Sequence, residues 1–405
     1  MNTKIIDPIK LVDKKKVEAI ITNCPEREGS TLDTVCKYIK RYKSNLNDSE
    51  KAWLVYRWIA LNISYDAEGF LSGHYGDLSP QGVFRSGKSV CSGYSQLFCY
   101  FISKLGLEVV RVVGWAKGAD YDVERILVEP NHEWNAVSLN ENWYLIDVTW
   151  GAGSFYKNKF IKEYDEYYFC TDPRNLIRSH YPENTQFQLL DPKVKHGIAL
   201  QMLRFSSLFY QSNFIRAEPD RIIIKVSDQT QFKLFFNRDP PNVTATLKLN
   251  GKKLEGSLFV QKHASYYTVN TYLYVIGKYD LTFFVYIKDE YSLLYEYRLI
   301  CTNNSKKRVY PGQYFCYNEL NTVLYSPMEG ILNKGYIYIF KLSFPLSEMK
   351  VAVVIKNIWY YLTYYKEDHL MIFEGELRVD GECIEVYVRT SNMKSYSTLL
   401  EYIVI

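Results

Sequence analysis

The sequence predicts a mixed α+β domain followed by two all-β sandwiches. Its 405 residues exceed what one ordinary hydrophobic core accommodates, which indicates two or three domains. Hydrophobic residues make up 47% and charged residues 23%, the balance of a folded chain rather than a disordered one. Helical and strand-like patterns alternate up to about Pro192, and aromatic or β-branched runs separated by turn residues dominate after about residue 200. This change of pattern separates an α+β half from an all-β half.

Two helices are predicted near the N-terminus, at about residues 32–42 and 48–63. The second begins after Asn47, and Glu50 follows three residues later. An Asn and a Glu at this spacing form a capping box, in which each side chain binds the backbone N–H of the other. The start of the second helix is therefore fixed by local sequence.

A further helix is predicted to begin at Cys91. Apolar residues recur at helical spacing from Tyr94 to Leu105, and Gly106 ends the pattern. Counting back three residues from Tyr94 places Cys91 on the same apolar face, in the first turn. Because a helix N-terminus stabilises a thiolate, this position suits a nucleophile.

A β-hairpin is predicted from two strand-like runs at residues 132–139 and 143–150. If the loop is the two residues Asn140 and Glu141, His132 pairs with Thr149 and lies diagonal to Asp147 on one face. An odd register would place His132 and Asp147 on opposite faces. The even register therefore allows the carboxylate to orient the imidazole.

Cys91, His132 and Asp147 supply a nucleophile, a base and a group that orients the base. Each also has a structural interpretation, as a packing cysteine, a core histidine and a turn aspartate. The combination of a helix-start cysteine with a His/Asp hairpin favours a catalytic triad. The other seven cysteines lack such partners and are interpreted as packing residues: Cys24, Cys36, Cys99, Cys170, Cys301, Cys316 and Cys383.

The segments around these residues share their pattern with a known family. They are residues 58–66, 87–98, 110–118, 132–137, 147–153, 168–173, 180–182 and 187–192. Together they resemble the transglutaminase-like superfamily and, within it, the kyphoscoliosis peptidase group. The resemblance covers roughly residues 50–192 and implies a papain-like, transglutaminase-like core with Cys91, His132 and Asp147 as its catalytic residues.

One departure from the family concerns the oxyanion site. Well-known transglutaminases with a similar core place a Trp ahead of the nucleophile as an oxyanion donor, and no Trp lies between Trp58 and Cys91. The backbone N–H of Cys91 is one candidate donor. Gln81 is a second candidate on its chemistry alone, but we interpret it as a turn residue.

The all-β half contains an internal repeat. Gly277 corresponds to Gly381 at an offset of 104, and the segment 296–300 corresponds to 401–405 at an offset of 105. Units of this length fit two immunoglobulin-like sandwiches, although the antibody-type Cys…Trp…Cys spacing is absent. Tyr279 resembles a tyrosine corner, and the second unit has Cys383 at that position. The predicted domains are residues 1–195, 200–303 and 304–405.

Charge, apolar runs and cysteine spacing exclude several classes of function. The net charge of +4 argues against nucleic acid as a main partner. No apolar run reaches the length of a membrane span, and the first residues lack a signal-peptide pattern, so we expect a cytoplasmic protein without a membrane partner. Neither a Cys-x-x-Cys pair nor a calcium loop is present, so no metal or cofactor is expected.

The residues and the resemblance together predict cysteine acyl transfer or hydrolysis on protein substrates, through a thioester on Cys91. An amine acceptor would give cross-linking, and water would give hydrolysis or deamidation; the sequence does not choose between them. The alternative is a weakly active or inactive cytoskeleton-associated adaptor, whose sandwiches bind cytoskeletal proteins. A glycan-cleaving enzyme is disfavoured because no paired carboxylates stand out.

Overall fold

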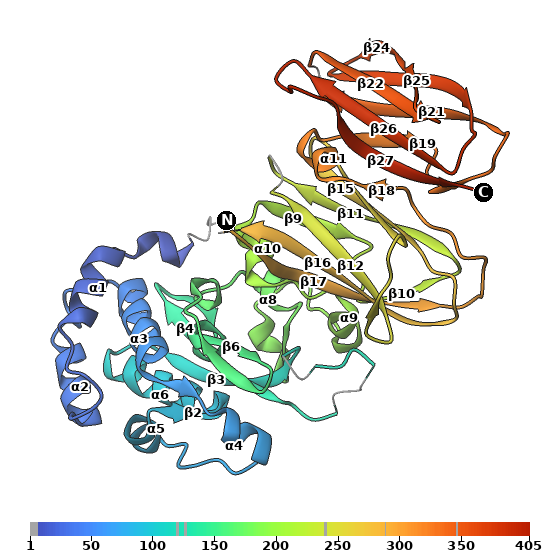
Figure 1. The fold of residues 1–405 in the computed structure, drawn as a ribbon. Coiled ribbons are helices and arrows are strands. Elements are labelled where there is room, and N and C mark those ends of the chain that lie inside the picture. Colours follow the sequence, from blue (N-terminus) through green and yellow to red (C-terminus); the bar gives the residue numbers. More distant parts are fainter. Residues whose placement is uncertain (1–6, 119–120, 125–127, 239–240, 288, 346) are drawn as a thin grey trace. The chain divides into compact units, whose positions relative to one another are not determined.

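The computed structural model describes residues 7–118, 121–124, 128–238, 241–287, 289–345 and 347–405 (Figure 1). These residues form two compact units, Met1–Leu200 and Gln201–Ile405. The first unit combines helices with a four-stranded sheet, and the second consists of β-sheets with a few short helices. The fold class predicted from the sequence is confirmed.

The first unit places helices against an antiparallel sheet of order β5-β4-β3-β8. Its helices are η1 (Pro8–Leu11), α1 (Lys14–Thr22), α2 (Leu32–Lys40), α3 (Asp48–Asn62), α4 (Ala67–Ser72), α5 (Pro80–Ser86), α6 (Cys91–Lys104), α7 (Val148–Ala152), η2 (Glu166–Tyr168), α8 (Pro173–Leu176), η3 (Thr185–Gln188) and α9 (His196–Gln201). Its strands are β1 (Ser64–Tyr65), β2 (Lys88–Ser89), β3 (Val109–Ala116), β4 (His132–Leu139), β5 (Asn142–Ile146), β6 (Gly153–Tyr156), β7 (Lys159–Lys162) and β8 (His180–Pro182).

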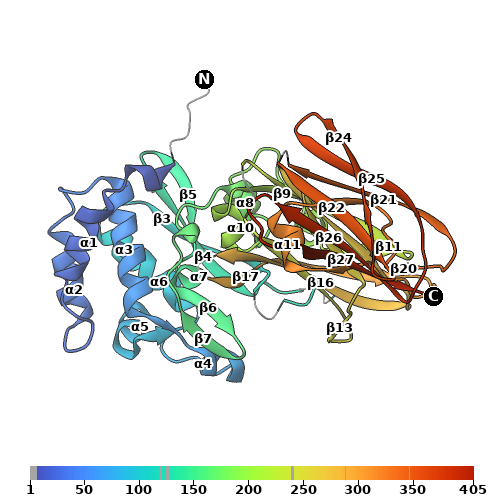
Figure 2. The same ribbon diagram turned by 45° about the horizontal axis from the view of Figure 1, so that its top comes forward.

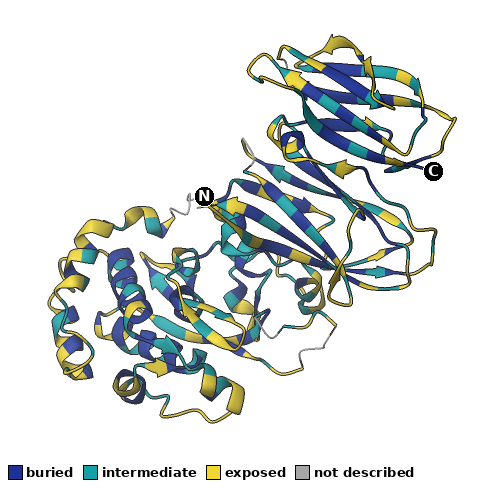
Figure 3. Ribbon diagram, in the orientation of Figure 1, coloured by how far each residue is buried: buried dark blue, intermediate teal, exposed yellow. Residues whose placement is uncertain are grey.

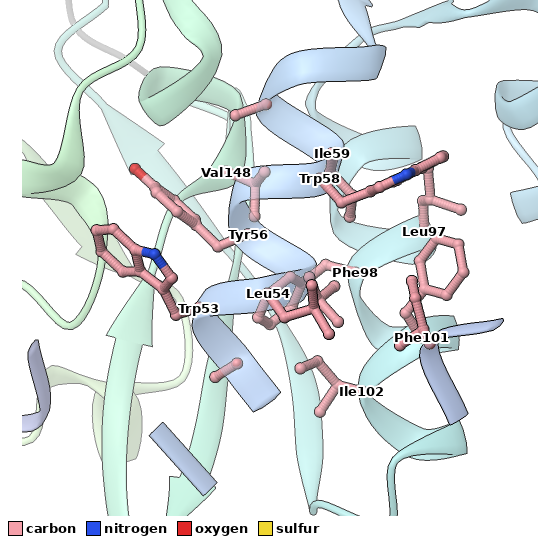
Figure 4. Close-up of a cluster of buried hydrophobic side chains, with 14 of the residues drawn as sticks. Trp53, Leu54, Tyr56, Trp58, Ile59, Leu97, Phe98, Phe101, Ile102 and Val148 are labelled. Atoms are coloured by element: carbon pink, nitrogen blue, oxygen red, sulfur yellow. The ribbon is translucent and has the colours of Figure 1, made fainter. Parts of the chain in front are cut away.

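The central helix α3 begins at the predicted capping box and lies in the core. Asn47 Oδ1 accepts the Glu50 N–H at 2.9 Å, and Glu50 Oε2 accepts the Asn47 N–H at 3.0 Å. Most of α3 is buried, as its dark colour in Figure 3 shows. Trp58 stacks on Phe84 of α5. It also meets Phe101 of α6 edge-on (Figure 4). This core fixes α6, and with it Cys91, against the rest of the unit.

The β4–β5 hairpin has the predicted even register. Asn135 pairs with Ile146 and Leu139 with Asn142, so that the loop is Asn140 and Glu141. Both loop residues have positive φ, 49° and 65°, as a type I′ turn requires. The predicted second strand at 143–150 is too long, however, because β5 ends at Ile146 and α7 follows.

The second unit contains two β-sandwiches, each made of two sheets (Figure 2). The first contains β9 (Phe214–Glu218), β10 (Ile223–Val226), β11 (Gln229–Phe236), β12 (Val243–Leu249), β13 (Lys252–Lys253), β14 (Leu258–Lys262), β15 (Tyr266–Tyr272), β16 (Gly277–Ile287) and β17 (Glu290–Cys301). The second contains β18 (Gly312–Gln313), β19 (Val323–Ser326), β20 (Ile331–Leu332), β21 (Ile337–Pro345), β22 (Met349–Ile355), β23 (Ile358–Tyr361), β24 (Thr363–Glu367), β25 (Leu370–Arg378), β26 (Cys383–Thr390) and β27 (Ser397–Val404). Two short helices, α10 (Ser207–Gln211) and α11 (Phe315–Glu319), accompany them.

The two sandwiches have the same topology. The first has sheets β10-β17-β16-β12-β13 and β14-β15-β11-β9. In the second, β27-β26-β22-β23 and β24-β25-β21-β19 repeat this order, and β20 pairs with β27 in parallel as β10 pairs with β17. The repeat inferred from the sequence is therefore present in the strand order. Tyr279 also forms the expected corner, because its hydroxyl donates to Val275 O at 2.8 Å.

The second sandwich completes its core with side chains from the first. Phe259 of β14 and Tyr272 of β15 belong to the same apolar cluster as Tyr317 and Phe340. Gln261 of β14 adds polar contacts, since its Oε1 accepts the Tyr317 O–H at 2.7 Å. The two sandwiches therefore share a core.

Candidate active site

Cys91 is the first residue of α6 and is half-buried. The residue before it, Val90, has no side-chain group that could cap the helix. A Cβ atom at Gly93 would lie 1.9 Å from Ser89 Oγ, so glycine is what allows the first turn of α6 to pack this closely on the preceding strand. The thiol therefore lies at a tightly held helix N-terminus.

His132, the first residue of β4, links the thiol to the carboxylate. Its Nε2 lies 2.7 Å from Asp147 Oδ2, and Cys91 is near enough to contribute to the raised pKa of the ring. Since Asp147 occupies Nε2, Nδ1 is the ring nitrogen left for the thiol. The three residues selected from the sequence thus lie in one site.

Asp147 is the N-cap of α7 and is buried. Its Oδ1 accepts the Trp150 backbone N–H at 3.0 Å, and its Oδ2 faces His132. The residue was expected on a strand diagonal to His132. It reaches the imidazole instead from the turn between β5 and α7, because the strand has already ended.

Burial and neighbouring charges have opposite effects on the pKa values of His132 and Asp147. Burial lowers the pKa of His132, but the charge and hydrogen bond of Asp147, together with Cys91, outweigh it and raise the pKa above its ordinary value. Burial likewise raises the pKa of Asp147, and the two histidines around it outweigh burial and hold the pKa below its ordinary range. The geometry therefore favours a charged imidazolium beside a charged carboxylate.

Polar contacts hold α6 on β4. Ser92, next to the nucleophile, donates to Glu133 Oε1 at 2.6 Å. Ser95 Oγ donates to the Trp134 carbonyl at 3.2 Å, and Asn135 Nδ2 donates to Ser95 Oγ at 3.1 Å. Because the contacts join consecutive residues of the strand to successive turns of the helix, they set the distance between Cys91 and His132.

A fourth residue of the site, His180 of β8, was not identified from the sequence. Its Nε2 lies 3.0 Å from the same Asp147 Oδ2, and its side chain is fully buried. It lies in a segment that resembles the family, 180–182, but neither spacing nor pattern ties a residue 33 positions downstream to Asp147. Only the pairing of β8 with β3 brings it there.

The remaining sequence-based assignments have mixed outcomes. Gln81 is an exposed residue of helix α5, not a turn residue. Cys36, Cys301 and Cys316 are buried as packing residues should be, whereas Cys383 is exposed. Burial raises the pKa of the Cys24, Cys99 and Cys383 thiols to about 11 and also raises that of Cys170 and Cys316.

His132, Asp147 and His180 are also the one set of described residues whose potential metal-ligand atoms cluster, within 4.8 Å of one another. Both imidazole Nε2 atoms contact the same carboxylate oxygen. Nitrogens that converge on one carboxylate are arranged as hydrogen-bond donors to it, not as ligands around a cation. We therefore describe the group as a hydrogen-bonded site.

Comparison with known proteins gives a family for part of the first unit. Residues 36–148 match the family model of the transglutaminase-like superfamily. Kyphoscoliosis peptidase of Mus musculus is 31% identical over 259 residues, which are 63% of this chain and 39% of that protein. Hillarin of Drosophila melanogaster is 31% identical over 225 residues, which are 52% of this chain and 26% of that protein. The chain thus spans well under half the length of these relatives.

Among solved structures, the N-terminal Ig1-2 module of the Drosophila receptor protein tyrosine phosphatase DLAR is similar to 47% of this chain and 96% of its own, at 12% identity and a TM-score of 0.16. The match to the family model lies within the first unit, whereas the alignments with the two relatives are longer than that unit and extend into the second. The first unit therefore contains a transglutaminase-like domain, and the chain is similar to kyphoscoliosis peptidase, as its sequence had indicated.

Proposed function

We propose that this protein is a cysteine-dependent acyltransferase or hydrolase acting on protein substrates. The observation that carries the proposal is the line from the Cys91 thiol through His132 to the buried Asp147. A thiol, a base and an orienting carboxylate in this arrangement are what nucleophilic catalysis requires. A chain that only binds partners has no need of them.

In the proposed reaction, Cys91 Sγ attacks a carbonyl carbon of a glutamine carboxamide or peptide bond. His132 takes the thiol proton, and the C–N bond breaks as His132 returns that proton to the leaving amine. Asp147 holds the His132 ring and its charge throughout. An amine or water then attacks the thioester, His132 takes the proton of the attacking group, and Cys91 leaves as the thiol. The acceptor decides between cross-linking and hydrolysis or deamidation.

The test is to treat the full chain with a glutamine-mimic chloromethyl ketone and to map the modified residue by mass spectrometry. We expect modification at Cys91 that is lost in His132→Ala, with Cys99 as an internal control, because that thiol lies on the same helix away from His132. Equal labelling of Cys91 in both proteins would contradict the proposal.

A second candidate function, partner binding by the sandwiches, is favoured by an exposed aromatic surface on the second sandwich. Neighbouring strands β23 and β24 end their sheets and expose six large side chains: Ile358, Trp359, Tyr360, Tyr361, Tyr364 and Tyr365. Exposed apolar surfaces of this kind mark interaction sites. We call this set the β23–β24 surface.

The first sandwich indicates what the β23–β24 surface binds. The equivalent cross-strand ladders are Leu234–Tyr267–Lys262 in the first sandwich and Leu342–Phe373–Tyr364 in the second. The strand of the second sandwich equivalent to β14 is therefore β24. Phe259 of β14 is fully buried by the following sandwich, whereas every residue of β24 is exposed, and the neighbouring Tyr361 of β23 is 58% exposed. We therefore propose a β-sandwich of a partner protein as the occupant.

This candidate is tested by placing the photo-crosslinker p-benzoylphenylalanine at position 361 of the full chain, with position 336, which is 65% exposed, as the control. A crosslink to an immunoglobulin-like sandwich at position 361 alone supports it. A crosslink to another fold, or none above the control, overturns it.

The cellular location belongs to the same proposal. A search of the described residues finds no helix with the length and apolar character of a membrane span. We propose a cytoplasmic protein associated with the cytoskeleton, with protein substrates and neither nucleic acid nor membrane as partner. Fractionation of cells expressing the tagged chain would test this, and recovery with membranes after a salt wash would contradict it.

A further inference from the structure

We propose that His180 is a positioning residue of the active site, holding the Asp147 carboxylate in the orientation that His132 requires. The inference rests on the proposed function, in which Cys91 and His132 are the reacting pair. His180 does not contact the substrate in this proposal. It acts only by holding Asp147.

His180 and His132 contact the same carboxylate oxygen of Asp147. Asp147 Oδ2 lies 2.7 Å from His132 Nε2 and 3.0 Å from His180 Nε2, while Oδ1 accepts the Trp150 N–H at 3.0 Å. A buried carboxylate needs hydrogen bonds to stay ionised. Three N–H groups on two oxygens supply them and also fix the rotation of the carboxylate about its Cβ–Cγ bond.

The His180 ring is itself held on several sides. Its backbone lies in β8, where it pairs with Ala116 of β3. The Trp150 ring meets it edge-on at 4.3 Å between centroids, and the Trp134 ring does so at 5.2 Å. A ring packed between two tryptophans has little freedom to turn, so its Nε2 stays directed at Asp147.

The other ring nitrogen has a partner that suits either protonation state. His180 Nδ1 lies 2.8 Å from Ser179 Oγ, which lies 3.2 Å from the Leu176 carbonyl. In the neutral ring, Nδ1 accepts the Ser179 O–H. In the charged ring, Nδ1–H donates to Ser179 Oγ, whose own O–H then turns to Leu176 O. Nε2–H donates to Asp147 in both states, so the positioning contact does not depend on the charge of His180.

His180 contacts the Asp147 carboxylate through Nε2, and several rings surround it. The rings around it belong to His132 at 5.4 Å, Trp150, Trp134 and Tyr168 at 6.4 Å between centroids. Without the His180 N–H, Asp147 would lose one of its three donors and ionise less readily. The Cys91–His132 pair depends on that charge, so its acid limit should move to higher pH.

A merely structural role would be to fill space beside Trp150. His180→Phe keeps most of the ring volume without an N–H, and His180→Gln keeps an N–H donor without a titratable group. Leu176→Ala is the matched control, because Leu176 lies in the same small core as Trp134 and the substitution keeps the backbone carbonyl that Ser179 contacts.

The readout is the rate of Cys91 alkylation by iodoacetamide between pH 4 and 9, measured on the full chain by mass spectrometry. We expect His180→Phe to slow it about tenfold at pH 7 and to shift its acid limb upward. His180→Gln should restore most of the rate and the wild-type limb. Leu176→Ala should lower the melting temperature without moving the limb.

The proposal is overturned if His180→Phe keeps the wild-type profile, if His180→Gln is as slow as His180→Phe, or if Leu176→Ala shifts the limb equally. Nitrogen-15 NMR of histidine-labelled wild type tests it without any variant, since His180 should carry its proton on Nε2. A bare Nε2 contradicts it. The proposed function fails separately, if His132→Ala leaves Cys91 alkylation unchanged.

Discussion

The two carboxylate oxygens of Asp147 contact three groups. Oδ1 caps α7 through the Trp150 N–H, and Oδ2 contacts His132 and His180. The cap fixes where the carboxylate lies, and the histidines fix which oxygen faces His132. One side chain therefore starts a helix and orients the His132 imidazole, so its replacement should affect stability and reactivity together.

At the scale of single residues, we expect Cys91 to be alkylated fastest of the eight cysteines near neutral pH. Burial raises the pKa of Cys24, Cys99 and Cys383 to about 11, which keeps these thiols protonated. His132→Ala removes the base and should slow Cys91 by about tenfold or more. Competitive iodoacetamide labelling at pH 7 with peptide mapping measures all eight rates, and a Cys91 rate equal to that of exposed Cys383 contradicts the prediction.

Asp147→Asn should lower stability in a pH-dependent way. The lowered pKa of Asp147 contributes stability that is present above the unfolded value near 3.9 and is lost as the pH falls through the folded value. The raised pKa of His132 contributes stability that is present below about 6.5 and is lost as the pH rises through the folded value. The difference from wild type should therefore be largest between about pH 4 and 6.5, on the order of 3 kcal/mol.

Urea unfolding of both proteins from pH 2 to 10 measures this difference. A constant gap across the range would show that the substitution acts through the α7 cap alone, because the Trp150 N–H does not titrate. The same variant should lose about three to four orders of magnitude in turnover if the triad is catalytic.

At the scale of elements, the polar contacts between α6 and β4 decide where the nucleophile lies. Asn135 is buried, and its Nδ2 reaches Ser95 Oγ at 3.1 Å and Cys99 Sγ at 3.2 Å. Apolar side chains could hold the helix on the sheet equally well, but they would allow it to slide. Hydrogen bonds between particular atoms of α6 and β4 fix the position of the helix along the strand instead.

Asn135→Leu should therefore cost about 1–3 kcal/mol in the free energy of unfolding, because it removes the donor to the buried Ser95 hydroxyl, which keeps only the Trp134 carbonyl as a partner. It should also slow Cys91 alkylation, although residue 135 does not touch the thiol. Ser138→Ala, a half-buried position on the same strand, is the control and should change neither quantity beyond about 0.5 kcal/mol. A destabilised Asn135→Leu protein with unchanged Cys91 reactivity would show that register is held elsewhere.

At the scale of the whole molecule, the chain forms two compact units, and the sandwiches of the second unit depend on each other. Phe259 of the first sandwich completes the core of the second, and Gln261 binds Tyr317 beside it. The equivalent strand of the second sandwich, β24, is exposed along its length. The same strand thus packs against a neighbouring sandwich in one repeat and is exposed in the other.

Because Phe259 is buried and Tyr361 is exposed, truncating the two side chains should lower the free energy of unfolding by unequal amounts. Phe259→Ala should destabilise residues 201–405 by about 3–5 kcal/mol, because it opens a cavity in a shared core. Tyr361→Ala should change stability by no more than about 0.5 kcal/mol. Denaturant unfolding of the full chain, followed by near-ultraviolet circular dichroism, measures both. Equal effects would mean that the two sandwiches do not share a core in solution.

The sequence by itself determined the features that depend on near neighbours. The capping box of Asn47 and Glu50, the start of α6 at Cys91 and the two-residue turn of the β4–β5 hairpin all follow from residues a few positions apart. The repeat was also readable. A stronger signal than the glycines we used is the recurrence of Phe232-Lys233-Leu234 as Phe340-Lys341-Leu342, on equivalent strands β11 and β21.

Only the tertiary structure decided which distant groups meet. Strand β5 ends at Ile146 because the Asp147 side chain caps α7, a choice between strand and helix that the pattern of residues 143–150 did not reveal. His180 joins Asp147 across 33 residues because β8 pairs with β3, and Phe259 leaves its own sandwich to complete the next one. Local patterns fix backbone conformation, whereas the partner of a buried polar or aromatic side chain depends on how whole sheets and helices pack.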